Sequence, residues 1–404
     1  MAKIEILTRA SALHEKSALD AMKKTLIEAL RQAAPFEVEE VTKPSGDHLA
    51  AVLVLTGGVE REVLKLVAQL PPTSILIAHP GHNSLPASLE ILARIRRDGG
   101  EGRILYGEPE IVVRELELEI ALANAWNALR FSRVGLIGEP SEWLIASDVD
   151  PAYLKGRLAI ETINIKISEF KKRIAAAEVD KKDVQEFTQN AKNVVGPKPE
   201  DIKDAIAVYK GLRSLVDEHR LAACSVRCFD LVTDLDTTGC YALARLNDEG
   251  IPTGCEGDAQ TLFSLYIGSL LTNQVAFMGN VASVDTENKV LGLAHCMCPL
   301  SMAMHYTIYT HFESDLGIGI SGEFPTGPCT VFRLGGERLD QLFVTQGTLE
   351  NPEFRNDLCR TQLRILTEDP IDALLNAPLG NHHILIPGHH KIAIERFFAR
   401  YLEP

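Results

Sequence analysis

The stretch Ala50-Ala51-Val52-Leu53-Val54-Leu55, followed directly by Thr56-Gly57-Gly58, decides the fold class of this chain. Consecutive apolar residues that end at a glycine pair are typical of a strand buried on both faces and of the tight turn that leaves it. The next segment, 60–70, has helical periodicity, and a second apolar run follows at Ser74–Ala78. A strand, a helix and another strand in this order predict a parallel sheet with helices on both faces.

The same alternation extends in both directions from that stretch. Further strands are expected at 3–7, 103–106 and 133–138, and further helices at 18–32, 85–97 and 392–402. Residues 160–220 are rich in Lys, Glu, Asp and Ala and predict a helical elaboration over a second α/β domain. After about residue 305, Gly and Thr punctuation predicts short antiparallel strands, which form a small barrel or a sandwich.

Composition limits the classes of protein to which the chain can belong. Its 404 residues predict two or three domains, and a formal charge of -14 argues against nucleic acid or an anionic membrane as a partner. The first residues do not resemble a signal peptide, and no apolar run reaches the length of a membrane span. The eight cysteines are scattered among apolar residues. We therefore expect a cytoplasmic protein with reduced thiols.

Three separate segments carry residues suited to chemistry. They are Gly254-Cys255-Glu256-Gly257-Asp258, Leu293-Ala294-His295-Cys296 and Gly380-Asn381-His382-His383. Carboxylates and imidazoles are ligands for divalent cations, and segments this far apart can meet only in a folded site. The pattern predicts a metal-dependent enzyme. Because neighbours in a strand point to opposite faces, only one of His382 and His383 is expected to coordinate.

These motifs and their surroundings resemble the L-fucose isomerase and L-arabinose isomerase superfamily. The most specific part consists of Cys228-Phe229-Asp230-Leu231, Thr238-Gly239-Cys240-Tyr241-Ala242-Leu243, Leu246-Asn247-Asp248-Glu249-Gly250-Ile251 and Cys255-Glu256-Gly257-Asp258. Phe277-Met278-Gly279-Asn280, Ala294-His295-Cys296 and Gly380-Asn381-His382-His383 carry the rest. The runs Asn83-Ser84-Leu85-Pro86-Ala87 and Ser141-Glu142-Trp143-Leu144-Ile145-Ala146-Ser147 are similar to uncharacterised branches of the superfamily. The chain looks shorter than the named sugar isomerases.

The resemblance implies two Rossmann-like parallel-sheet α/β domains followed by a small antiparallel β-barrel domain. We expect the first domain at 1–130, the second at 131–300 with the metal-site residues and an elaboration at about 160–220, and the barrel with its closing helix at 301–404. It also implies a Mn²⁺ centre, with Mg²⁺, Fe²⁺ or Co²⁺ as alternatives. The superfamily builds its sites near subunit contacts, so a homo-oligomer larger than a dimer is expected.

By position, the resemblance assigns metal and catalytic roles to particular residues. Glu256 matches the first metal carboxylate, and Asn280 stands where the second carboxylate is expected. His295 matches a further histidine ligand, and His382 or His383 matches the histidine of the barrel domain. An amide cannot accept a proton at neutral pH. Either Glu256 is therefore the sole base, or another acid such as Asp258 or Asp230, or a metal-bound hydroxide, has taken the second role, or the protein does not carry out isomerase chemistry.

Four further residues are candidates for contact with a sugar. His82 and Asn83 follow a strand at the carboxyl end of the first sheet, where ligands bind, although Asn83 could simply cap the next helix. Trp143 could stack on a sugar face or anchor the second domain. Arg333 alternates out of phase with its apolar neighbours, so it faces either the cleft or solvent.

The resulting hypothesis is a metal-dependent aldose–ketose isomerase that acts on a small or modified sugar through an enediol(ate). The alternatives are a non-catalytic sugar-binding protein, which Asn280 favours, and an epimerase or lyase that forms the same enediolate.

Overall fold

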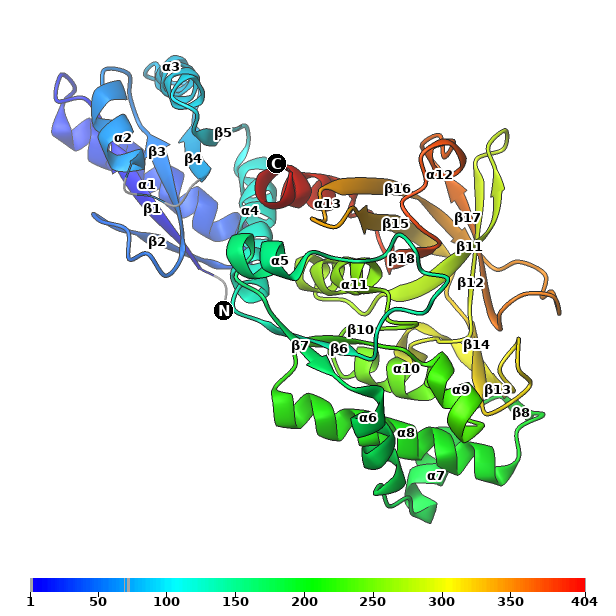
Figure 1. The fold of residues 1–404 in the computed structure, drawn as a ribbon. Helices are drawn as coiled ribbons and strands as arrows, with labels where there is room; N and C mark the ends of the chain where they lie inside the picture. Colours follow the sequence, from blue (N-terminus) through cyan, green and yellow to red (C-terminus); the bar gives the residue numbers. More distant parts are fainter. Residues whose placement is uncertain (1–2, 69, 71–72, 404) are drawn as a thin grey trace. The chain divides into compact units, whose positions relative to one another are not determined.

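The computed structural model describes residues 3–68, 70 and 73–403, which form two compact units, Met1–Ala123 and Asn124–Pro404 (Figure 1). The first unit holds a five-stranded sheet in the order β2-β1-β3-β4-β5, with every pairing parallel. Its strands are β1 Lys3–Arg9, β2 Glu37–Glu40, β3 Leu49–Val54, β4 Thr73–Ala78 and β5 Glu101–Tyr106. Its helices are α1 Lys16–Ala33, α2 Glu60–Val67, α3 Ser84–Arg97 and α4 Pro109–Leu129, the last of which continues into the second unit.

Helices cover both faces of this first sheet, as the apolar runs predict. On one face, α1 and α4 contribute Ile27 and Leu116 to a cluster that also contains Leu53. On the other face, α2 and α3 contribute Val63 and Ile91 to a second cluster. Residues of β3 alternate between the two clusters, which is why the whole strand is apolar.

The second unit contains a parallel sheet in the order β10-β9-β6-β7. Its strands are β6 Arg133–Ile137, β7 Glu161–Ile165, β9 Ala223–Val226 and β10 Thr253–Gly254. The associated helices are α5 Pro151–Arg157, α6 Ile167–Ala175, α7 Lys181–Thr188, α8 Pro199–His219, α9 Phe229–Leu235, α10 Cys240–Asp248 and α11 Ala259–Thr272. A small sheet, β14-β13-β8, joins Gly319–Glu323, His305–Tyr309 and Asn193–Val195.

A closed six-stranded antiparallel barrel completes the second unit, so the predicted fold class is confirmed. Its strands are β11 Phe277–Asp285, β12 Val290–His295, β15 Gly327–Gly335, β16 Gln341–Glu350, β17 Thr361–Thr367 and β18 His382–Pro387. The barrel takes its first two strands from residues 277–295, ahead of the expected start at 301. This unit also contains the short helices α12 Ala373–Asn376 and α13 Lys391–Phe397. A 3₁₀ turn covers Leu300–Met302, and a π-helical turn, Phe398–Leu402, follows α13.

Helix α11 packs tightly against the barrel. A Cβ atom at Gly268 would lie 2.7 Å from Ile386 Cδ1 and 3.0 Å from Phe332 Cζ, so any larger residue would have to displace these side chains. The N-terminus of α11 is thereby fixed beside the barrel strands that carry the histidines. Among the described residues, no helix is both long and apolar enough to cross a membrane.

Candidate active site

The loop between β10 and α11 presents the first candidate residue, Glu256. Glu256 has a φ of 61°, a left-handed conformation that is uncommon for a non-glycine residue and that clusters at functional sites. Gly257 follows with a φ of 75°, and a Cβ atom there would lie 2.8 Å from Pro140 Cα. The backbone N–H of Ser141 donates to the Glu256 carbonyl at 2.9 Å. Contacts with segment 140–141 therefore hold the loop in this unusual shape.

Asp258 ends the loop and is completely buried. Its Oδ1 accepts a hydrogen bond from the backbone N–H of Thr261 at 2.8 Å, which caps α11. Its Oδ2 lies 3.0 Å from His382 Nδ1 and 3.2 Å from Arg333 Nη1. Both oxygens of Asp258 are bound by protein groups, and Asp258 does not line the pocket described below, so its role as a second acid or base stays a prediction.

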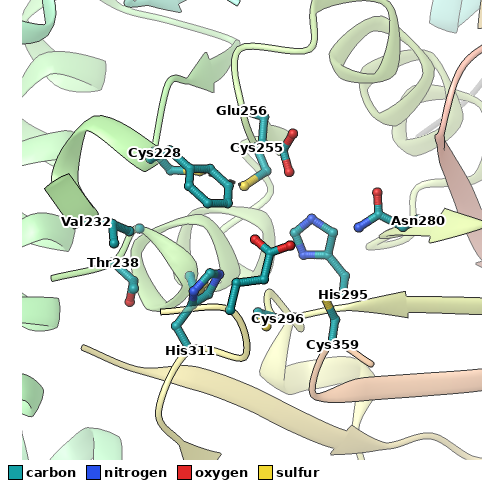
Figure 2. A pocket seen from close by; sticks show the side chains of 14 residues that line it. Cys228, Val232, Thr238, Cys255, Glu256, Asn280, His295, Cys296, His311 and Cys359 are labelled. Atoms are coloured by element: carbon teal, nitrogen blue, oxygen red, sulfur yellow. Dashed lines mark hydrogen bonds between the residues drawn. The ribbon is translucent and has the colours of Figure 1, made fainter. Parts of the chain in front are cut away.

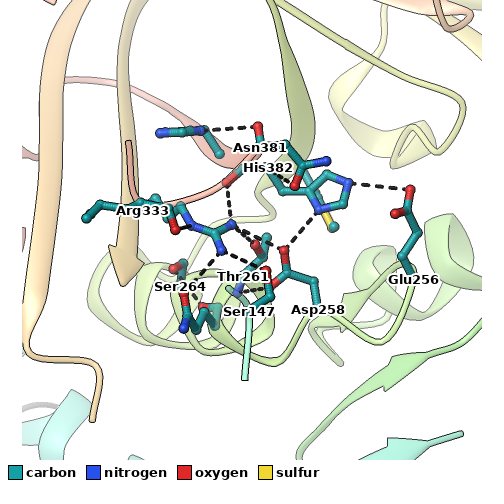
Figure 3. A network of polar contacts seen from close by, with 12 residues as sticks. Ser147, Glu256, Asp258, Thr261, Ser264, Arg333, Asn381 and His382 are labelled. Atoms are coloured by element: carbon teal, nitrogen blue, oxygen red, sulfur yellow. Dashed lines mark hydrogen bonds and ion pairs between the residues drawn. The ribbon is translucent and has the colours of Figure 1, made fainter. Parts of the chain in front are cut away.

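Arg333 is also completely buried, so the solvent-facing alternative is wrong, while its role as a substrate contact stays a prediction. Its guanidinium donates to Asp258, to the Thr261 hydroxyl at 2.5 Å and to the His382 carbonyl at 2.8 Å. The remaining donors bind Leu379, Ser147 and Gln260 (Figure 3). The five N–H donors of the guanidinium are shared among these six acceptors, which explains how the charge is tolerated at a buried position.

His382 lies between two carboxylates. Its Nδ1 contacts Asp258, while its Nε2 lies 3.6 Å from Glu256 Oε1 and has no hydrogen-bond partner although it is buried (Figure 3). Burial lowers the pKa of His382, but the hydrogen bond with Asp258 and the negative charges of Asp258 and Glu256 outweigh it and raise the pKa to about 9. Asp258 thus orients the ring so that Nε2 points toward Glu256.

Glu256 is nearly buried, and both of its oxygens have neighbours. Trp143 Nε1 donates to Oε2 at 2.5 Å, and the indole packs edge-on against Phe229 with ring centroids 4.9 Å apart. Burial raises the pKa of Glu256, yet the nearby charge of His382, with help from the Trp143 hydrogen bond, holds that pKa below its usual value. Glu256 is therefore ionised at neutral pH, and Trp143 contacts the candidate base itself.

Barrel register brings Asn280 to the same place. In β11, Asn280 pairs with His382 of β18 on one side and with Ala294 of β12 on the other. Its Oδ1 accepts a hydrogen bond from Asn381 Nδ2 at 2.9 Å. The segments that the sequence singles out therefore meet through strand pairing at one end of the barrel.

His295 ends β12, with its ring centroid 5.6 Å from that of His382. Its Nδ1 accepts the backbone N–H of Met297 at 2.9 Å, and burial, followed by the charge of His382, lowers its pKa to about 3. The ring is therefore neutral with its proton on Nε2, which makes that nitrogen a donor. Side-chain atoms of His295, Cys255 and Glu256 lie within 4.8 Å of one another, which is close enough to surround a cation. In this tautomer, however, the His295 ring has no free lone pair, because Nδ1 accepts from Met297 and Nε2 carries the proton.

His383 points away from this group, as strand alternation requires. Its ring lies edge-on to Phe343, with centroids 5.3 Å apart, and burial lowers its pKa to about 3. Of the two neighbouring histidines, His382 faces Glu256. Of the two, His382 is therefore the one placed to act as a ligand beside Glu256, and a metal role for either stays a prediction.

A pocket of about 470 Å³, including its open mouth, is lined by Glu256, Asn280 and His295 (Figure 2). Sequence reasoning did not identify His311 and Glu313, which also line it. Both lie in the segment between β13 and β14, which has no periodic pattern or motif that could have marked them. The residues that line the pocket also include the cysteines Cys228, Cys240, Cys255, Cys296 and Cys359.

His82 and Asn83 belong to the first unit, where they follow the carboxyl end of β4. Both have left-handed backbones, with φ of 52° and 57°. The His82 ring lies 5.4 Å from that of His14, and the Asn83 side chain makes no capping bond to α3. Their assignment as sugar contacts stays a prediction.

Three of the buried histidines, His295, His382 and His383, predict a stability maximum near pH 6.5 for the metal-free protein. His382 stabilises the fold fully below pH 6.5, and that contribution is lost as pH rises through about 9. His295 and His383 have the opposite effect, because their folded pKa values of about 3 cost stability as pH falls below 6.5. The alkaline loss should be about 3 kcal/mol, measured by urea unfolding across pH.

His382→Gln should remove most of that alkaline loss. The matched control is His389→Gln, which removes a histidine that is 44% exposed. A wild-type free energy of unfolding that stays constant from pH 6.5 to 9 would contradict the assigned His382 environment.

Comparison with known proteins identifies distant relatives. No family model matches the chain. A protein of Clostridium sp. (strain MSTE9) named sulfoquinovose isomerase is 25% identical over 256 residues, which cover 60% of this chain and 57% of that protein. A sulfoquinovose isomerase of Priestia aryabhattai is 22% identical over 312 residues, 72% of this chain and 69% of that protein. A third, from Alkalicoccus urumqiensis, is 28% identical over 130 residues, 31% of this chain.

The alignment thus spans less than two thirds of the Clostridium protein's length and slightly more than two thirds of the Priestia protein's. At these identities the chain is similar to proteins named as sugar isomerases.

Proposed function

We propose that this protein is an aldose–ketose isomerase that acts on a modified sugar. The observation that carries the proposal is the buried Asp258–His382–Glu256 arrangement, in which an oriented imidazole and an ionised carboxylate face each other beside a pocket. The relatives named sulfoquinovose isomerase support the reaction class. Asn280 favours a non-catalytic sugar-binding protein, but a buried Nε2 without a partner is costly to keep unless something binds it.

The residues of the pocket suit proton transfer between adjacent carbons. Glu256 is the candidate base, which takes the proton from carbon 2 of an open-chain aldose and returns it to carbon 1. The hydroxyl proton on oxygen 2 moves to oxygen 1, so the carbonyl shifts and no atom is lost. His295 Nε2–H is a neutral donor that can polarise the substrate carbonyl. Trp143 holds one oxygen of Glu256 and leaves the other toward His382.

A divalent cation fits this set of residues. His382 Nε2 offers a lone pair once its proton leaves, and Glu256 Oε1 and the Asn280 amide oxygen are oxygen donors from neighbouring strands and loops. Asp258 bound to the other nitrogen of His382 is the carboxylate–histidine pair that commonly orients metal ligands. Mn²⁺ is the preferred candidate, with Mg²⁺, Fe²⁺ or Co²⁺ as alternatives. Such a cation would stabilise the negative charge that develops on the sugar oxygens.

The pocket itself contains no evident site for a sulfonate. Among the described residues that line it, none is Lys or Arg. The proposal therefore concerns the reaction class, and both charged and neutral sugars belong in the test. The expected homo-oligomer stays a prediction.

Product analysis tests the proposed function. The full chain with Mn²⁺ in D₂O is incubated with sulfoquinovose and with neutral aldoses, and products are followed by NMR. An isomerase should yield a ketose with solvent deuterium at carbon 1. Deuterium at carbon 2 of an epimer, or carbon–carbon cleavage, would indicate the epimerase or lyase, and no turnover of any sugar would favour a binding protein.

Replacing Asn280 with aspartate should tighten Mn²⁺ binding, by about tenfold, because a carboxylate adds Coulomb attraction in a partly dehydrated site. The new carboxylate can still accept the Asn381 hydrogen bond, so the local structure should be kept. Isothermal titration of both forms measures the difference. An unchanged affinity would mean that Asn280 is not a ligand, and Asn376→Asp at the exposed end of α12 is the matched control.

A further inference from the structure

The proposed reaction needs two proton transfers, and Glu256 supplies only the one between the carbons. The hydroxyl proton must also pass from oxygen 2 to oxygen 1. Asn280 cannot carry it, because an amide is not basic at neutral pH. Asp258 does not line the pocket, and His295 already accepts a hydrogen bond at Nδ1, so its ring has no lone pair left for a proton. This second transfer therefore calls for another group in the pocket wall.

His311 occupies a suitable place in that wall. It follows β13 and lines the same pocket as Glu256, Asn280 and His295, and it is only 8% exposed. Figure 2 shows its ring facing the interior of the pocket from the side opposite Asn280. A sugar that fills the pocket would therefore have Glu256 and His311 on different sides.

The contacts of the His311 ring hold it in place and leave one nitrogen available. Nδ1 lies 3.1 Å from the Ser314 hydroxyl, and the ring is edge-on to Phe229, with centroids 5.7 Å apart. A hydroxyl can accept from Nδ1–H or donate to Nδ1, so Ser314 suits both neutral tautomers and the protonated ring. None of the described residues forms a hydrogen bond with Nε2 of His311. The ring can therefore take up and release a proton at Nε2 without losing its bond to Ser314.

The backbone around His311 is also fixed. The His311 N–H donates to the Leu316 carbonyl at 3.2 Å, and the Asp315 N–H donates to the His311 carbonyl at 3.0 Å. Arg360 Nε donates to the Thr310 carbonyl at 2.8 Å. The segment thus presents the imidazole from a closed turn, and little motion is needed to keep Nε2 aimed at a substrate.

Charge and exposure favour His311 over the other ionisable group of the same turn. Burial lowers the pKa of His311 and the Arg360 charge lowers it further, while Glu256 partly offsets both, so the ring is neutral at pH 7 and can accept a proton. Glu313 also lines the pocket but is exposed, and no hydrogen bond from another described residue orients its carboxylate.

We propose that His311 is a catalytic residue that carries the hydroxyl proton, an inference that rests on the proposed isomerase function. Glu256 first takes the proton from carbon 2. Nε2 of His311 then accepts the proton of the oxygen-2 hydroxyl, and the electron pair of that O–H bond forms the new carbonyl. The pair shared by carbons 1 and 2 takes the proton that Glu256 returns to carbon 1, and His311 gives its proton to oxygen 1. Carbon 2 is oxidised and carbon 1 reduced within the sugar, so no other reagent is needed.

Deuterium exchange separates the two transfers. The full chain with Mn²⁺ is incubated in D₂O with sulfoquinovose or with a neutral aldose that wild type converts. Glu256 alone can remove the proton from carbon 2 and return a deuteron to the same carbon. His311→Gln keeps a polar side chain but cannot carry a proton. It should slow ketose formation by about 100-fold and leave deuterium exchange at carbon 2 of the recovered aldose nearly unchanged.

Two further variants support this measurement. His305→Gln, at an exposed position of β13, is the matched control and should change neither rate. Ser314→Ala removes the partner of Nδ1 and should lower the ratio of ketose formation to exchange by a smaller factor, which supplies the same test if His311→Gln does not fold. Added imidazole should restore part of ketose formation in His311→Ala, an effect that a structural role would not produce.

The outcomes distinguish this proposal from the proposed function. If exchange and ketose formation fall equally in a folded His311→Gln, as judged by circular dichroism, or if both stay at the wild-type rate, His311 does not carry the proton and the isomerase function stands. If wild type neither exchanges nor converts any sugar, the proposed function is wrong and the role of His311 is refuted with it.

Discussion

Replacing Glu256 with alanine should lower isomerase turnover by about a thousandfold and remove tight Mn²⁺ binding. The variant loses both the candidate base and a candidate metal ligand, and both losses lower turnover. The pocket loses the carboxylate that lies 3.6 Å from His382 Nε2, and the candidate cation site loses the one carboxylate among its proposed ligands. The base alone accounts for about 10²- to 10⁴-fold in rate.

Metal content by mass spectrometry, together with turnover and circular dichroism, separates these losses from misfolding. Glu313→Gln is the discriminating variant, because Glu313 is the other carboxylate among the described residues that line the pocket. Glu323→Ala, at an exposed position of β14, controls for a general change of charge. Full Mn²⁺ occupancy in Glu256→Ala would refute its role as a ligand, and a larger loss of turnover in Glu313→Gln would transfer the base to that residue.

Local sequence patterns predict the first unit of this protein well. The run Ala50–Leu55 predicts β3, and Ser74–Ala78 predicts β4, because a strand buried on both faces must be apolar throughout. The barrel is harder to place. Its first strand, β11, is buried only as far as Gly279 and is partly exposed after that residue. The apolar pattern in the sequence is therefore short, and it places the start of the barrel later in the chain than the structure does.

The site residues divide in the same way. Glu256, Asn280 and His382 could be chosen from motifs, and strand pairing brings Asn280 opposite His382. The role of Arg333 could not be predicted, because an out-of-phase polar residue shows only which face it occupies. Its partner Asp258 lies 75 residues away in the sequence, and the two meet only because the barrel packs against α11. Their pairing could not be predicted without the tertiary structure.

The pair of Asp258 and Arg333 yields the largest expected effect on stability. Arg333→Met should reduce the free energy of unfolding by about 3–5 kcal/mol, because it leaves the Asp258 charge buried with fewer partners. Both side chains are fully buried, and the guanidinium also ties Thr261, Ser147 and Gln260 together. The control is Arg364→Met, which breaks an ion pair with Glu350 on neighbouring barrel strands where each side chain is 42% exposed. That change should cost about 1 kcal/mol or less.

The same substitution separates a structural role of Arg333 from a positioning role. Without the arginine, Asp258 is less firmly held, and His382 loses the hydrogen bond from the guanidinium to its carbonyl. Mn²⁺ affinity should then fall by about 10- to 100-fold, as when the partner of a metal-ligating histidine is removed. Denaturant unfolding of the intact chain and Mn²⁺ titration at low temperature, where the variant is folded, measure the two effects.

Adding Asp258→Asn to Arg333→Met should recover part of the stability, because it removes the buried charge, but should not restore Mn²⁺ affinity. If the double variant regained neither stability nor binding beyond the single one, the charge of Asp258 would not be the cause. If Arg333→Met bound Mn²⁺ as tightly as wild type, Arg333 would act only on the fold.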